Sequence, residues 1–146
     1  MFDGLVANYM TAQEVWSKVA NHLMQQGRVC YSQASGCAYH DYITGMKCAV
    51  GVLIPENEYT PNCEGQPIYL LRHKHFCPPT LKSLTDQLGE LLNDLQRIHD
   101  TNAGEKLTPA QQRKVWFTAL RNLASERRLN STEFETRWKS ELDLTY

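Results

Sequence analysis

The chain has 146 residues, of which 42% are hydrophobic and 21% charged, and its formal net charge is -1. This length and apolar fraction fit one globular domain over residues 1–146 with a core of its own, which excludes disorder over most of the chain. The near-neutral charge argues against a protein that neutralises many phosphates. No apolar run approaches the ~18 residues of a transmembrane helix, so a membrane partner is not expected.

The cysteines and the beginning of the chain bear on its compartment. Residues 1–6 have no basic leader and no long apolar run, so we expect no secretory signal. Five cysteines are an odd number, which favours reduced thiols over a disulfide framework. The chain is therefore expected in the cytoplasm.

The first predicted helix begins at Thr11. Glu14 lies three residues later and completes a capping box, in which each side chain bonds a backbone N–H of the first turn. Gly27 can adopt the left-handed conformation that ends a helix. His22 is expected as a hydrogen-bonded histidine at the boundary of the core. The buried face is predicted from apolar residues at helical spacing, namely Val15, Trp16, Val19, Ala20 and Leu23.

Residues 28–79 are expected to form an irregular unit with a small β-hairpin. Residues 29–31 and 37–43 have strand-like composition, and Thr44 with Gly45 offers a turn before residues 47–54. The apolar run at 48–54 fits a strand or a short buried helix equally well. The proline-rich stretch 55–67 is predicted to be a loop, and 68–71 a further strand.

The longest helix is predicted over residues 81–101, with Thr80 as its cap. Burial of one leucine stabilises a fold by ~1.5–3 kcal/mol, so its apolar stripe is predicted to be the central core. The stripe consists of Leu81, Leu84, Leu88, Leu91, Leu92, Leu95 and Ile98.

Two more helices are predicted after a break at Gly104. Thr108 and Pro109 suit the N-cap and first residue of one helix, and Asn130 or Ser131 the cap of the other. The predicted class is a mainly α domain of about four helices with a small β-hairpin or irregular unit in its middle. The inner residues of the two helices are Val115, Trp116, Ala119, Leu120 and Leu123, then Phe134, Trp138 and Leu142.

All five cysteines and three of the five histidines lie between residues 30 and 77. A zinc site uses four thiolate or imidazole ligands, usually as two close pairs. Cys37 with His40 is one candidate pair, and His75 with Cys77 or His73 the other. The alternative is that buried reduced cysteines pack as small apolar groups beside surface histidines. No cofactor is expected, with zinc as the alternative.

Cys48 is the candidate nucleophile, because Lys47 beside it can lower a thiol pKa. The base would be His99. Consecutive helix residues point ~100° apart, so Asp100 is not expected to orient this imidazole. His99 can instead lie at the helix end, where the dipole favours an imidazole. A single cysteine without a family signature is weak evidence, so an enzyme is not favoured.

Two charged faces are candidate contact surfaces. An acidic stripe is predicted on the longest helix, at Asp86, Glu90 and Asp94. A basic stripe is predicted on the next helix, at Lys114, Arg121 and Arg128. Such a basic face could contact nucleic acid or an acidic partner, whereas charged faces more often only keep a helix hydrated.

Three segments resemble a group of small proteins from bacteria and their phages. They are Cys37-Ala38-Tyr39, residues 45–55 followed by Tyr59, and residues 95–100. The resemblance covers residues 12–101 and implies no activity, cofactor or catalytic residue. It implies a phage-encoded accessory protein that acts inside a bacterial cell by binding a host protein.

Together these features favour a small non-enzymatic binding protein that modulates or inhibits a bacterial macromolecule. Besides the two charged stripes, the loop at 55–67 is a candidate contact surface, because loops on a rigid scaffold commonly carry function. Tyr59 is its candidate anchor, since tyrosine is frequent among interface hot spots. The alternatives are a cysteine-dependent enzyme using Cys48 with His99 and a zinc-stabilised nucleic-acid-binding module.

Overall fold

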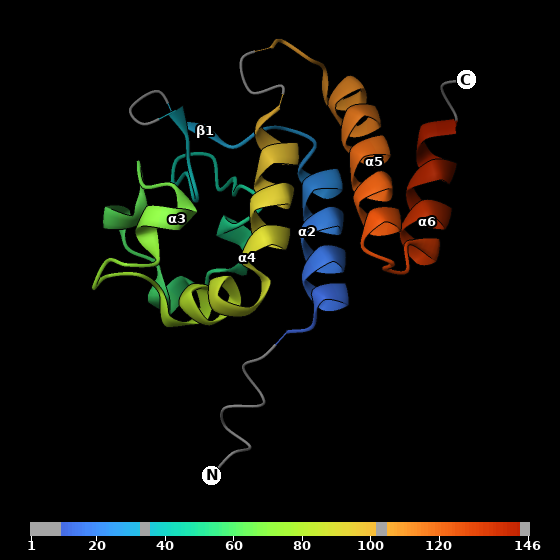
Figure 1. Cartoon of the computed structure of the whole chain (residues 1–146). Helices are drawn as coiled ribbons and strands as arrows, with labels where there is room; N and C mark the ends of the chain where they lie inside the picture. Colours follow the sequence, from blue (N-terminus) through green and yellow to red (C-terminus); the bar gives the residue numbers. More distant parts are fainter. Residues whose placement is uncertain (1–9, 33–35, 102–104, 144–146) are drawn as a thin grey trace.

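The computed structural model describes residues 10–32, 36–101 and 105–143, and its architecture is mainly helical (Figure 1). The longer helices are α2 (Ala12–Gln26), α4 (Pro79–Asp100), α5 (Pro109–Glu126) and α6 (Thr132–Asp143). Between α2 and α4 lies a middle segment, residues 28–78, with the antiparallel strands β1 (Tyr31–Ser32) and β2 (Gly36–Cys37). The predicted fold class, a mainly helical domain of about four helices with a small β-hairpin or irregular unit in its middle, is confirmed.

The helices form a bundle on one side of the molecule. In Figure 1, α2 lies between α4 and α5, and α6 lies on the outer side of α5. The packed pairs of helices are α2 with α4, α5 and α6, α4 with α5, and α5 with α6. The middle segment, with α3 (Ile68–Leu71), lies on the other side of α4.

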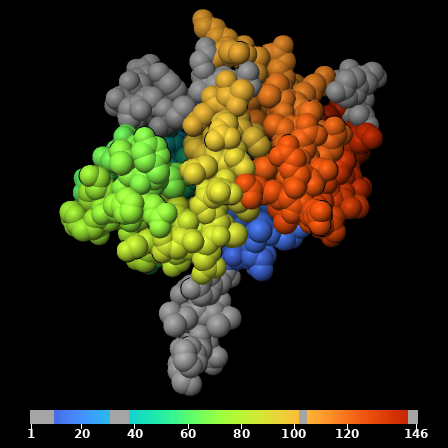
Figure 2. All heavy atoms as spheres, in the orientation of Figure 1, coloured from blue at the N-terminus to red at the C-terminus, as the bar shows by residue number. Residues whose placement is uncertain are grey.

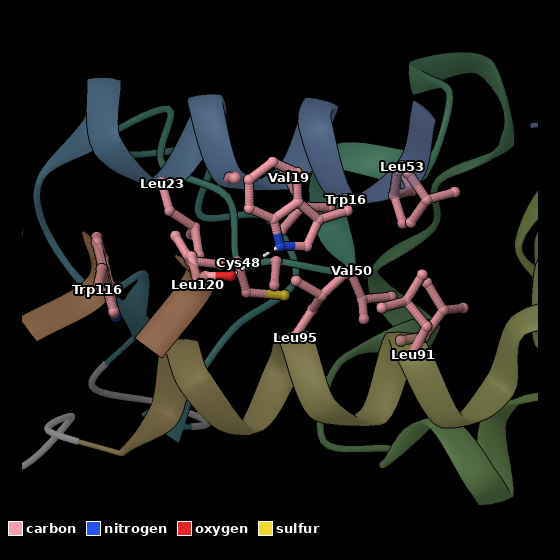
Figure 3. Packing of buried hydrophobic residues seen from close by; sticks show 14 of the residues in the cluster. Trp16, Val19, Leu23, Cys48, Val50, Leu53, Leu91, Leu95, Trp116 and Leu120 are labelled. Carbon is pink, nitrogen blue, oxygen red and sulfur yellow. Dashed lines mark hydrogen bonds between the residues drawn. The ribbon is translucent and has the colours of Figure 1, made fainter. Parts of the chain in front are cut away.

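The core lies where α2, α4 and α5 meet the middle segment, as Figure 3 shows. Trp16 on α2 is 1% exposed, and its indole N–H donates to the backbone oxygen of Leu120 at 3.1 Å. Most of the predicted leucine stripe is buried, whereas Leu88 and Ile98 are only half-buried. The buried members are Leu81, Leu84, Leu91, Leu92 and Leu95.

The predicted boundaries of α2 are confirmed. The Thr11 hydroxyl accepts the Glu14 N–H at 3.1 Å, and the Glu14 carboxylate accepts the Thr11 N–H at 2.9 Å. Gly27 ends the helix in the left-handed region, at φ 69°. His22 is half-buried and donates to the backbone oxygen of Lys47 at 3.0 Å, as expected of a boundary histidine.

Helix α4 differs from prediction at its start and near its centre. It begins at Pro79, and Thr80 does not cap it: the N–H and hydroxyl of Thr80 donate to Glu58 at 2.9 and 2.8 Å. Leu88 leaves helical geometry, with φ -127° and ψ 28°, so the helix bends there, next to Gly89. Figure 1 shows the two halves of α4 running in different directions.

The last two helices largely follow the prediction. Thr108 caps α5, with Gln111 completing a capping box and Pro109 as first residue. Val115 is 40% exposed, so its predicted inward position is wrong, and Phe117 at 7% exposure is buried instead. Of the two predicted caps of α6, the Asn130 side chain accepts the N–H of Thr132 at 2.9 Å. The predicted inner residues of α6 are buried, namely Phe134, Trp138 and Leu142.

The middle segment has less strand than predicted. Beyond β1 and β2, residues 37–47 contribute only an isolated bridge between His40 and Lys47. Residues 48–54 contain the 3-10 turn Gly51–Leu53, and the loop at 55–67 carries two more, Glu56–Glu58 and Pro61–Cys63. Residues 68–71 form α3, so the predicted strand there is wrong. Gly104, the predicted helix break, lies outside the described residues.

Candidate functional site

An ordered turn stands out from the middle segment at residues 41–45. The Asp41 carboxylate accepts the Ile43 N–H at 3.1 Å and the Thr44 hydroxyl at 2.9 Å. The Asp41 carbonyl accepts the Gly45 N–H at 2.7 Å, and Gly45, which was predicted to form a turn with Thr44, has a left-handed φ of 77°. Bonds internal to the turn therefore fix its shape.

This turn exposes apolar side chains. Ile43 is 95% exposed and Tyr42 is 65% exposed. The Tyr42 ring packs against the rings of His40 and Tyr59, with centroids 4.3 and 5.4 Å away. The Tyr42 ring is therefore held by contacts with two neighbouring rings, whereas the Ile43 side chain is almost fully exposed to solvent.

Tyr59, the predicted anchor, has an internal role in addition. It is half-buried, and its hydroxyl donates to Glu64 at 2.5 Å. Burial, and then the bond to Glu64, raise the pKa of Tyr59, so the phenol stays a protonated donor. Glu64 also accepts the N–H groups of Tyr39 and His40 at 2.9 and 3.1 Å. Glu64 thus holds the turn's base to the loop at 55–67, a role that sequence reasoning missed because the partners lie 24 and 25 residues away.

A cleft of about 670 Å³ lies between α4 and the middle segment. One wall is the second half of α4 and the other is residues 65–69, which Figure 2 shows side by side in yellow and green. Ala38, Tyr39 and Cys48 also line it. The α4 wall presents polar side chains: Asn93, Gln96, Arg97 and Asp100.

The expectation that Asp100 would not orient His99 is wrong. Asp100 Oδ1 lies 2.7 Å from Nδ1 of His99, although the residues are consecutive on α4. The ~100° step separates the Cβ directions, but Nδ1 is the ring nitrogen nearest the backbone, within reach of a short carboxylate. His99 is fully buried, and its Nε2 accepts the N–H of Cys30 at 3.0 Å, so the ring does not project from the helix end.

The geometry of Cys48 does not suit a nucleophile. The side chain is 1% exposed, and its sulfur accepts the Gly51 N–H at 3.2 Å. Burial, the largest influence, raises the pKa of this thiol, so the thiolate is disfavoured. Both ring nitrogens of His99 are engaged, by Cys30 and Asp100, so His99 is not available as a base for the thiol. These contacts are typical of a packing cysteine.

The candidate zinc ligands whose side chains the structure describes are not gathered around a centre. In the described part of the chain, no three His, Cys, Asp or Glu side chains are placed to hold a metal ion. His40 packs against tyrosine rings, His75 is exposed beside Phe76, and Cys77 is buried. His73 is exposed. The side chain of Cys37 lies outside the described residues.

The predicted acidic stripe is interrupted. Asp86 lies before the bend of α4, whereas Glu90 and Asp94 lie after it. Asp86 pairs with Arg72 at 2.5 Å, and Asp94 with Arg127 at 2.6 Å. Glu90 is exposed. Two of the three carboxylates therefore already have cationic partners within the chain.

The predicted basic stripe does not form one helical face. Helix α5 ends at Glu126, and Arg128 follows it in the left-handed region, at φ 58°. The Arg121 guanidinium lies over the ring of Phe117, 5.6 Å from its centroid. Lys114 is half-buried on α5. The prediction placed all three cations on one helix, and it is wrong for Arg128.

None of the helices in the described ranges combines the length and hydropathy that crossing a membrane requires. No protein-family model, curated protein or solved structure matches the chain.

Proposed function

We propose that the protein is a non-enzymatic binding protein that contacts a partner protein through the turn at residues 41–45. The observation that carries the proposal is Ile43, 95% exposed on a turn fixed by its own hydrogen bonds. Burial of such a side chain in a partner contributes ~1.5–3 kcal/mol. A turn that is already ordered loses little conformational freedom on binding.

The ring cluster beside the turn supports the same role. Tyr42 is exposed and rests on His40 and Tyr59, so a large contact area is presented with few freely rotating bonds. The partner that fits is a protein with an apolar pocket for Ile43 and a hydrogen-bonding group for the Tyr42 hydroxyl. Tyr59 contributes by holding Tyr42 in place.

The resemblance to small bacterial and phage proteins supplies the biological part of the proposal. On that basis the chain is a phage-encoded accessory protein in the cytoplasm of a bacterial host, and its partner is a host protein that it modulates or inhibits. Nucleic acid is the less favoured partner, because Arg128 lies off the helical face of Lys114 and Arg121.

Capture from bacterial lysate tests this proposal. Immobilised wild-type chain, Ile43→Asp and Val115→Asp are compared by quantitative mass spectrometry. Val115 is the matched control, an exposed aliphatic residue on α5. A protein that wild type and Val115→Asp retain should be lost from Ile43→Asp, and its purified form should bind Ile43→Asp about tenfold more weakly or worse.

Two results would refute the proposal. One is equal retention of every captured protein by Ile43→Asp and wild type, with both variants melting as wild type does. The other is retention of nothing beyond the level of an unrelated immobilised protein.

A further inference from the structure

We infer that the cleft beside Asp100 is a binding site for a small organic cation, an ammonium group attached to an apolar body. The ligand's N–H groups donate to Asp100 Oδ2, and its body lies against residues 67–69. This site is separate from the proposed protein contact at the turn.

The first argument is the state of the Asp100 carboxylate. Oδ1 accepts hydrogen bonds from His99 Nδ1 at 2.7 Å and from Gln96 Nε2 at 2.9 Å. Within the described ranges, no group bonds Oδ2, and the side chain is 41% exposed. One oxygen thus holds the carboxylate in position while the other remains available to a ligand in the cleft.

The second argument is the group behind the carboxylate. His99 Nε2 accepts the Cys30 N–H, so the ring proton is on Nδ1 and the ring is neutral in this arrangement. The imidazole is fully buried and stacks on Trp116, with centroids 5.9 Å apart. A neutral donor orients Asp100 without cancelling its charge, which therefore remains for a cationic ligand.

The remaining lining fits an organic cation. Pro67, Ile68 and Tyr69 offer apolar contact, and the 65% exposed Tyr69 ring can lie against an ammonium group. The volume of about 670 Å³ is typical of small-molecule sites. Arg97 also lines the cleft, but its guanidinium donates to Asp94 at 3.1 Å and its side chain is 74% exposed. Asp100 is the more firmly positioned of the two charges.

The test uses benzylamine, an ammonium on an apolar ring, and benzoate, an anion of similar shape. Each is titrated at pH 7 into the full chain while backbone amide NMR signals are followed. Benzylamine should shift the signals of Gln96, Asp100 and Tyr69 with a millimolar dissociation constant, and benzoate should not.

Asp100→Asn is the informative variant. Its side-chain oxygen can still accept from His99 and Gln96, so the fold is retained, while Oδ2 is replaced by a donor. Binding of benzylamine should weaken by about tenfold or more. Glu90→Gln removes one exposed charge outside the cleft and should bind as wild type does.

A second variant keeps the test decisive if Asp100→Asn fails to fold. Arg97→Gln removes the competing cation and should strengthen benzylamine binding about two- to fivefold. Unchanged benzylamine binding by Asp100→Asn, or absence of shifts in the cleft signals of wild type, would overturn the inference. Preferential binding of benzoate, lost in Arg97→Gln, would also overturn it and would make Arg97 an anion site.

Discussion

The helical bundle and the middle segment share one apolar core but differ in the polar contacts that support it. The bundle joins helices through large buried side chains such as Trp16, Leu95 and Leu120. The middle segment contributes buried apolar side chains such as Val50 and Leu53 to the same core, and it is joined to the rest of the chain in addition by side chains that bond distant backbone groups. Gln26 forms two bonds of 2.9 Å with the backbone of Lys47, and Gln96 accepts the N–H of Val50 at 3.1 Å.

The polar contacts of the middle segment bear on the two proposed binding surfaces. Apolar burial is non-directional and tolerates small shifts, whereas a hydrogen bond to the backbone fixes one segment at one distance. The exposed turn at 41–45 and the cleft residues Ala38, Tyr39, Cys48 and 65–69 belong to the middle segment. The region with fewer long elements therefore carries the exposed turn and one side of the cleft, whose other side, with Asp100, belongs to α4. Three substitutions and one change of pH test this difference between the two regions.

The largest effect is expected in the bundle. Leu95→Ala removes a fully buried side chain, and the cavity left behind should lower the free energy of unfolding by ~2–5 kcal/mol. Leu70→Ala is the control, because Leu70 is 45% exposed on α3. Urea unfolding followed by circular dichroism measures both. Similar losses for the two variants would contradict a bundle-centred core.

A second change crowds the middle segment. A Cβ at Gly51 would lie 1.8 Å from the backbone oxygen of Tyr39. Gly51→Ala should therefore displace the backbone at Gly51 or at Tyr39 and lower the free energy of unfolding by ~1–3 kcal/mol or more. Gly89→Ala is the control, since its Cβ would meet nothing within 4 Å and alanine favours a helix. The melting temperature should fall for Gly51→Ala and not for Gly89→Ala.

The third change weakens the hydrogen bonds that Glu64 accepts in the middle segment. Glu64 accepts three hydrogen bonds, from Tyr39, His40 and Tyr59, whereas a glutamine there has one acceptor oxygen. Glu64→Gln should therefore cost ~1–3 kcal/mol, chiefly within the middle segment. Amide hydrogen exchange should accelerate at Tyr39 and His40 but not at core amides of α5. Uniform acceleration across the chain would show that the two regions open together.

The smallest effect is a pH dependence. Burial raises the pKa of Cys48, so the unfolded chain loses this proton at lower pH than the folded chain does. Stability is then complete below the ordinary thiol pKa of ~8.5 and falls above it, by about 1 kcal/mol per pH unit for this thiol. Urea unfolding at pH 7.5 and 9.5 measures the fall, which should be smaller in Cys48→Ala.

Sequence reasoning was most successful where the signals are local. The boundaries of α2 follow from its capping box and Gly27, and the start of α5 follows from Thr108 and Pro109, as predicted. The bend of α4 was missed because the leucine stripe continues through Leu88 without a break. The strand predicted at 68–71 failed because a short apolar run fits either element, and Pro67 begins a helix there.

The candidate sites depended on contacts that local patterns do not encode. The role of Glu64 arises from partners more than twenty residues away. The pairing of His99 with Asp100 was excluded from Cβ directions alone, although the side-chain ends meet. The exposure of Ile43 could not be read from a stretch of strand-like composition, because composition does not tell which residue occupies the tip of a turn.

The bend at Leu88 divides α4 into two parts that contact different regions of the molecule. The part before Leu88 contacts the middle segment through Thr80 and Asp86, which form hydrogen bonds with Glu58 and Arg72, respectively. The part after Leu88 packs in the helical bundle and forms the polar wall of the cleft. The bend at Leu88 therefore sets the angle between the part of α4 that contacts the middle segment and the part that carries Asn93, Gln96, Arg97 and Asp100.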